Sequence, residues 1–271
     1  KTKFFSSFQH LDQGGTIVGN NISRTTGRLN VDQQANNWLD LGVSLSLSRT
    51  FNRRLPGDNA FSNPLQSAAL LPMSPFLDPE TGLPIGTPPG DPNVGIYFNP
   101  RIQIDYARYV QDVYRTFGNT YFKVKLLPGL TFQSEFGLDF LSQNEERYWQ
   151  TQTVRNTSSP NGEGTNTGAF ITNYNTNSYF NYNKVAGKHN FAATLGMQYQ
   201  QSQAKYNSTT GLDFPSNSYQ KIASAATKSG GSSSQTDFRF LSYFLRSNYT
   251  FNEKYIVSAS GRIDASSRFG K

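Results

Sequence analysis

The chain lacks cysteine and has only two histidines among its 271 residues. The absence of cysteine excludes a disulfide scaffold and thiolate metal sites. His10 and His189 are far apart in the sequence and no cluster of other ligand residues lies near them, so we expect no metal site and no cofactor. P-loop, dinucleotide-binding and GxSxG motifs are also missing, and we therefore expect no catalytic residue and no enzyme activity.

Long hydrophobic runs are absent as well. No stretch approaches the roughly 18 consecutive apolar residues that a transmembrane helix needs, and the mean hydropathy is −0.58. No compact apolar run follows a basic start, so we expect no signal peptide in these residues. The net charge of +7 comes from 25 basic and 18 acidic residues spread along the chain without a clustered stripe. This distribution argues against nucleic-acid binding.

What the sequence does have is strict alternation, most clearly over residues 38–48. Leucine or valine occupies every odd position from Leu39 to Leu47, and Asp, Gly or Ser occupies the even positions. A strand of a soluble sandwich can alternate in this way too. However, the run is about as long as a tilted strand needs to cross a bilayer, and Trp38 lies at its end, where membrane interfaces favour aromatic residues.

Similar alternation recurs along the chain and predicts about nine antiparallel strands. We expect them over residues 4–9, 22–33, 38–48, 114–126, 130–140, 170–182, 191–199, 238–251 and 255–265. The expected connections are a turn-rich segment at 11–15, tight turns at 35–37, 127–129, 185–188 and 252–254, and long polar loops at 52–104, 151–167 and 207–235. Within the first long loop we expect a short helix over residues 63–71, because Asn63 can cap it and Pro64 fits its first position.

The connections alternate between short and long, which is typical of an outer-membrane β-barrel with short periplasmic turns and long extracellular loops. The pattern places Asn36, Pro128, Gly187 and Glu253 on the periplasmic side. Single-chain bacterial barrels have even strand numbers, and an open nine-stranded sheet would leave two unpaired edges in lipid. We therefore expect an all-β, antiparallel transmembrane barrel that is partial, with strands missing on both sides.

A family resemblance supports this interpretation. The final hairpin, residues 243–255 followed by 261–270, closely resembles the barrel signature of SusC/RagA-type TonB-dependent transporters of Bacteroidetes outer membranes. Residues 29–49, and 187–191 with Gly196 beyond them, are similar to further barrel segments of that family. Together these segments extend across most of the chain.

The resemblance implies that residues 1–271 are a segment of a roughly 22-stranded plugged barrel. It implies uptake of oligosaccharides or peptides together with a SusD-like surface lipoprotein, driven by the TonB complex, in the bacterial outer membrane. No plug, TonB box or amino-terminal accessory domain is recognisable in this sequence, so we expect contact with TonB through regions outside it. Alone, this segment should not transport a solute. The alternative is a secreted or surface β-protein that binds glycans without transport, and a passive porin is a third possibility.

Charged residues on the polar parity of the strands are candidates for contact with solute in a barrel lumen. They are Arg28, Asp32, Asp40, Lys123, Lys125, Glu135, Asp139, Arg262 and Asp264. The alternative role is pairing across strands or contact with a plug, because charged lumen residues are normal in such barrels. The loops at 52–104 and 207–235 are further candidates for binding a partner or substrate, or they shield the barrel mouth.

A glycosidase-like pair of carboxylates is the one catalytic arrangement that deserves comparison. Glu135 and Asp139 lie four residues apart on one strand, or roughly 13 Å at the usual rise. This separation is wide for such a pair, and it argues against an enzyme. The apolar parity gives a separate test, because a barrel exposes it to lipid and a soluble sandwich buries it against a second sheet. It includes Leu39, Val43, Phe132, Phe136, Leu195 and Tyr249.

Overall fold

The computed structural model describes residues 1–271 except 56–76, 78, 81, 83–103, 152–160 and 270–271. The described residues contain nine strands and one short 3-10 helix, η2. The elements are β1 (Thr2–Gly14), β2 (Asn21–Gln34), β3 (Leu39–Arg53), β4 (Ala107–Leu127), β5 (Leu130–Trp149), β6 (Glu163–Ala186), β7 (His189–Leu212), η2 (Ile222–Ser224), β8 (Thr227–Phe251) and β9 (Tyr255–Ser266).

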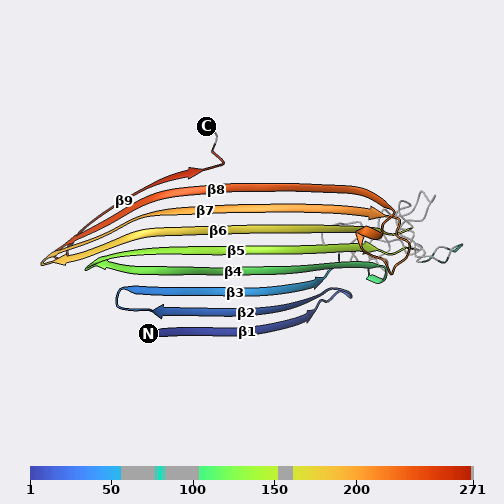
Figure 1. Cartoon of the computed structure of the whole chain (residues 1–271), viewed down its shortest axis with the longest axis horizontal. Helices are drawn as coiled ribbons and strands as arrows, with labels where there is room; N and C mark the ends of the chain where they lie inside the picture. The colour runs from blue at the N-terminus through green and yellow to red at the C-terminus, as the bar shows by residue number, and fades with distance from the viewer. Residues whose placement is uncertain (56–76, 78, 81, 83–103, 152–160, 270–271) are drawn as a thin grey trace.

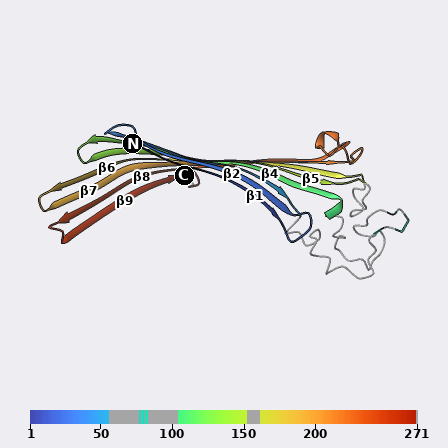
Figure 2. The same cartoon turned by 90° about the horizontal axis from the view of Figure 1, so that it is seen from below.

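All nine strands form one antiparallel sheet in sequence order, with β1 and β9 at its two edges (Figure 1). The alternating sequence forms this sheet because each strand needs only its neighbour along the chain as a hydrogen-bonding partner. Figure 2 shows a single bent layer of strands. Within the described residues there is no helix long and apolar enough to span a membrane. The predicted all-β antiparallel architecture with nine strands is confirmed.

The register of the ladders gives the sheet two chemically different sides. Residues directly opposite each other on paired strands share a side, and Leu29 pairs with Leu45, Phe132 with Phe180 and Leu195 with Leu245. We call this the apolar side and the other the polar side. The apolar side carries all six residues predicted for it, namely Leu39, Val43, Phe132, Phe136, Leu195 and Tyr249.

The large side chains of the apolar side are not covered. Leu195 is 56% exposed, Leu47 50% and Phe136 45%, and the described part of the chain contains no second sheet that could pack on them. Soluble proteins rarely expose a contiguous apolar surface of this extent, and a sandwich would bury it. The sheet is therefore a single wall that requires an apolar solvent on one side.

The short turns all lie at one end of the sheet, and the first three hairpins reach successively further outward, as the left side of Figure 1 shows. Leu39 pairs with Val124, whereas β4 continues to Leu127. Leu130 pairs with Tyr182, whereas β6 continues to Ala186. A stagger of this kind is what a barrel with tilted strands requires, so the sheet has the register of a barrel wall.

Several strands are longer than the sequence predicted. β6 begins at Glu163, so the predicted loop at 151–167 was wrong over residues 163–167. β7 ends at Leu212 and β8 begins at Thr227, so the predicted loop at 207–235 was wrong over residues 207–212 and 227–235. Likewise, β4 begins at Ala107 and β1 extends to Gly14. The ladder needs only backbone groups, so it continues where the apolar alternation ends. The predicted helix at 63–71 lies outside the described residues.

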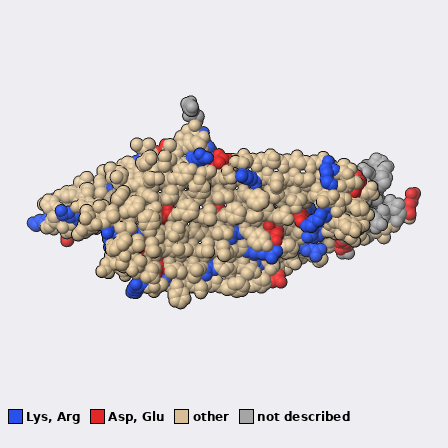
Figure 3. All heavy atoms as spheres, viewed as in Figure 1, with Lys and Arg blue, Asp and Glu red and all other residues tan. Residues whose placement is uncertain are grey.

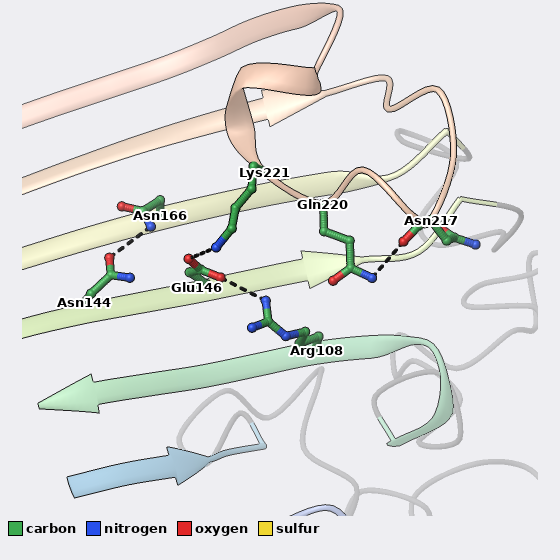
Figure 4. A network of polar contacts seen from close by, with 7 residues as sticks. All are labelled: Arg108, Asn144, Glu146, Asn166, Asn217, Gln220 and Lys221. Atoms are coloured by element: carbon green, nitrogen blue, oxygen red, sulfur yellow. Dashed lines mark hydrogen bonds and ion pairs between the residues drawn. The ribbon is translucent and has the colours of Figure 1, made fainter. Parts of the chain in front are cut away.

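The connection between β7 and β8, residues 213–226, folds back onto the apolar side of the sheet near the end that carries the longer connections. Phe214 is buried edge-to-face against Tyr148, with ring centroids 5.0 Å apart, and Ala225 completes this small core. Figure 4 shows Lys221 of the connection pointing at Glu146 of β5, which also accepts a hydrogen bond from Arg108 of β4 at 2.9 Å. The connection is thus anchored to three strands by packing and by charge.

Gly211 leaves room for this connection, and its substitution tests the packing. A Cβ at Gly211 would lie 2.6 Å from the Cβ of Ala225, and overpacking of this kind costs roughly 1–3 kcal/mol. We expect Gly211→Ala to loosen residues 213–226 and to speed tryptic cleavage after Lys221 about tenfold in the full-length protein. Gly230→Ala is the matched control, because its Cβ meets no atom within 4 Å. Equal cleavage rates of both variants would show that the connection does not depend on this contact.

Candidate functional site: the polar side of the sheet

The register places all nine charged residues predicted from the sequence on the polar side. They share it because the ladders are regular between their strands and the predicted parity holds from β2 to β9. The nine are Arg28, Asp32, Asp40, Lys123, Lys125, Glu135, Asp139, Arg262 and Asp264.

The ladders bring six of the nine into two adjacent rows that cross the sheet from strand to strand. The carboxylate row contains Asp32, Gly42, Tyr121, Glu135, Asn177, Gln198, Ser242 and Asp264, each paired with the next. The mixed row contains Asp40, Lys123, Gln133, Tyr179, Gly196, Phe244 and Arg262. Arg28 and Asp139 share a third row through Ser46 and Phe117, and Lys125 lies in another. Sequence spacing alone does not reveal this alignment, because it depends on register.

Two tyrosines hold the carboxylates at the centre of these rows. The hydroxyl of Tyr121 donates to Oδ1 of Asp32 at 2.8 Å, and that of Tyr179 donates to Oε1 of Glu135 at 2.9 Å. To reach Asp32, the ring of Tyr121 crosses β3 over Gly42, where a Cβ would lie 2.0 Å from its Cε1 atom. A glycine is therefore required at position 42, because the ring of Tyr121 approaches the backbone closely on the polar side.

Three further predicted residues, Arg262, Asp264 and Asp139, are neutralised by ion pairs. Arg262 donates to Asp264 at 2.7 Å and to the Oγ of Ser242 at 3.0 Å, and Ser242 is fully buried. Arg115 forms a two-pronged ion pair with Asp139, with Nε–Oδ1 and Nη2–Oδ2 distances of 2.7 and 2.8 Å. Sequence reasoning missed Arg115, although its position on the parity of Lys123 could have indicated it. These contacts fit the role of pairing across strands.

The other four predicted residues, Arg28, Asp40, Lys123 and Lys125, differ from the first five. Within the part of the chain that the structure describes, their side chains have no hydrogen bond or ion pair with another residue. Asp40 and Lys123 line an open hollow of about 540 Å³ together with Lys3, Asp32 and Tyr121. The polar side therefore combines carboxylates that are already hydrogen-bonded with charged groups available to another molecule.

Metal binding finds no support in this geometry. Among the described residues, no group of three or more His, Asp or Glu side chains is arranged to hold a metal ion. The described part of the loop candidate at 207–235 also lies elsewhere, because residues 213–226 pack on the apolar side. Most of the candidate at 52–104 lies outside the described residues. The polar side of the strands is thus the described surface best suited to a hydrophilic solute or a polar protein domain.

Comparison with known proteins identifies relatives of this two-sided wall. The chain is 27% identical over its full length to the TonB-dependent receptor P39 of Formosa agariphila and covers 25% of that protein. It is 26% identical over its full length to the TonB-dependent receptor P3 of the same organism and covers 27% of it. The chain thus spans about a quarter of the length of these relatives. No protein-family model matches it.

Solved structures share the fold. The structure of the RagAB peptide transporter superposes with a TM-score of 0.81 over 99% of this chain and 31% of its own, at 21% identity. The ferric-catecholate import receptor Fiu of E. coli K12 gives a TM-score of 0.51 over 98% of this chain, at 12% identity. The chain is thus similar over its whole length to TonB-dependent receptors, and its nine strands share the fold of part of the RagAB peptide transporter, in agreement with the resemblance to the SusC/RagA type that the sequence showed.

Proposed function

We propose that residues 1–271 form part of the wall and lumen face of an energised importer. The observation that carries the proposal is the single sheet with an exposed apolar side and a polar side lined by Asp40, Lys123 and Lys125. A barrel of this kind exposes the first to lipid and encloses the second around an aqueous or protein-filled lumen. The named relatives, two TonB-dependent receptors and a peptide transporter, support an import role.

The remainder of the protein supplies the other parts in this proposal. A plug lies in the lumen, outside residues 1–271, and receives energy from the TonB complex. A SusD-like lipoprotein at the cell surface captures an oligosaccharide or peptide and delivers it to the barrel. Two observations support this division of roles: the final hairpin resembles the family signature, and the fold is shared with the RagAB peptide transporter.

Deletion of the full-length gene tests energised import. We expect the loss of growth on one class of oligosaccharide or peptide, and we expect the same loss when tonB is deleted instead. Uptake is measured with a labelled substrate in both strains and in the complemented strain. Uptake that persists without TonB would indicate a passive porin. A full-length product that fractionates as a secreted protein free of membrane would support a surface adhesin.

The available charges of the polar side give a second prediction. The double variant Asp40→Asn, Lys123→Gln removes two charged groups that have no partner among the described residues, so we expect normal folding and a several-fold lower uptake per folded transporter. The measurement is labelled uptake normalised to the amount of heat-modifiable barrel in the outer membrane.

A variant at Gly42 provides the contrast. Gly42→Val displaces the ring of Tyr121 from Asp32, and such overpacking costs roughly 1–3 kcal/mol. We expect a lower midpoint of heat-dependent unfolding and a smaller loss of uptake per folded barrel than in the double variant, because Asp40 and Lys123 remain. If both variants affect only stability, the charges of the polar side serve the wall alone.

A further inference from the structure

On β6, β7 and β8, the apolar side ends at a clear boundary toward the end of the sheet that carries the longer connections. The hydroxyl of Tyr199 donates to Oε1 of Gln201 at 3.0 Å, and the hydroxyl of Tyr174 donates to the same oxygen. Tyrosines with an apolar ring and a polar tip mark the membrane interface. Toward the end of the longer connections, these strands therefore continue through the headgroup layer.

Two cations lie on the same side, Arg239 at this boundary and Lys205 four residues beyond it. Arg239 pairs with Gln201 in the ladder, Lys205 pairs with Gln235, and both are exposed. Neither side chain has a carboxylate within ion-pair distance among the described residues. Asp237 lies between them in the register, and its Oδ2 accepts hydrogen bonds from Gln201 at 3.4 Å and Gln203 at 3.3 Å.

Three other cations of this side are neutralised by an acid. Arg49 pairs with Asp112 at 2.8 Å, and Arg108 and Lys221 share Glu146. Figure 3 shows charged side chains gathered more over the end with the longer connections than over the centre of the face. Lys205 and Arg239 thus differ from these paired cations in having positive charge left for an external anion.

The surroundings of Lys205 suit a phosphorylated sugar. A hollow of about 470 Å³ is lined on this side by Phe170, Lys205, Asn207, Ser233 and Gln235. The ammonium group can bind a phosphate, and the amide and hydroxyl groups can bind sugar hydroxyls. Phe170 is 46% exposed and offers its ring as a stacking surface. The apolar belt begins four residues further along the strands, at the row of Tyr174, Gln201 and Arg239, and the acyl chains of a lipid would lie beyond that row.

We propose that Lys205 and Arg239, with the hollow beside Phe170, bind the phosphorylated sugar headgroup of a glycolipid in the outer leaflet. A lipid is favoured over a soluble phosphosugar because Arg239 lies in the row of Tyr174, at the edge of the apolar belt that faces the membrane. The site lies on the side of the sheet that faces the membrane. The inference therefore rests on the part of the proposed function that places the sheet in a membrane, and it does not rest on the identity of the imported solute.

The test uses the full-length transporter, purified in detergent and stripped of lipid. Binding of a bisphosphorylated glycolipid of the lipid A type is measured by native mass spectrometry, beside the dephosphorylated glycolipid and inorganic phosphate. We expect Lys205→Gln with Arg239→Gln to weaken binding of the phosphorylated lipid at least tenfold. Lys184→Gln is the matched control, because it removes one positive charge from the same side near the short-turn end.

The outcomes separate the sources of the anion. Equal binding by the double variant and the unmodified protein overturns the proposal, as does equal binding of the dephosphorylated lipid. Inorganic phosphate that binds as tightly as the lipid overturns the assignment to a lipid headgroup. Heat-modifiable migration on gels confirms that each variant is folded, so weaker binding cannot be attributed to a lost barrel.

Discussion

The backbone ladder is the interaction on which the rest of this structure depends. In the described residues, only six hydrophobic side chains are buried, so no core determines how the strands align. Register determines the two sides instead, because a slip of one residue would turn every side chain of a strand to the opposite side. The cost would be charged groups such as Lys123 and Glu135 in lipid, about 2–4 kcal/mol for a lysine at the midplane and less for a glutamate. The membrane thus enforces the register that a core enforces in a soluble protein.

The sequence predicted most accurately where one side of a strand meets lipid. Over residues 38–48 and 130–140, lipid on one side and a polar environment on the other impose a period of two, and the strands and their parity could be read directly. Over residues 227–237, Ser, Gly, Thr and Lys dominate, and this composition resembles a loop. The segment is nevertheless part of β8, because its backbone pairs with β7. β6 has 24 residues and β8 has 25, against about 9–11 needed to cross a bilayer, so much of each strand lies where that period is not imposed.

The candidate site shows the same limit of sequence reasoning. Parity identified the side on which Asp32, Asp40 and Glu135 lie, because parity is local. Their partners are not local: Tyr121 reaches Asp32 across 89 positions of the sequence, and it does so only because Gly42 leaves room between them. Register and the absent side chain of Gly42 therefore decide whether a charged residue of the polar side is already paired or available. Neither can be inferred from a single strand.

The placement of residues 213–226 explains how long hairpins and an open lumen face can coexist. A connection at the mouth of a barrel can fold over either side of the wall. Here Phe214 and Lys221 anchor it on the apolar side, beyond the tyrosine boundary, where Tyr148 and Glu146 are available as partners. Because its apolar and charged groups are satisfied there, this connection does not cover the polar side of β5 to β7. The extended strands thus hold this connection on the apolar side, away from the polar rows.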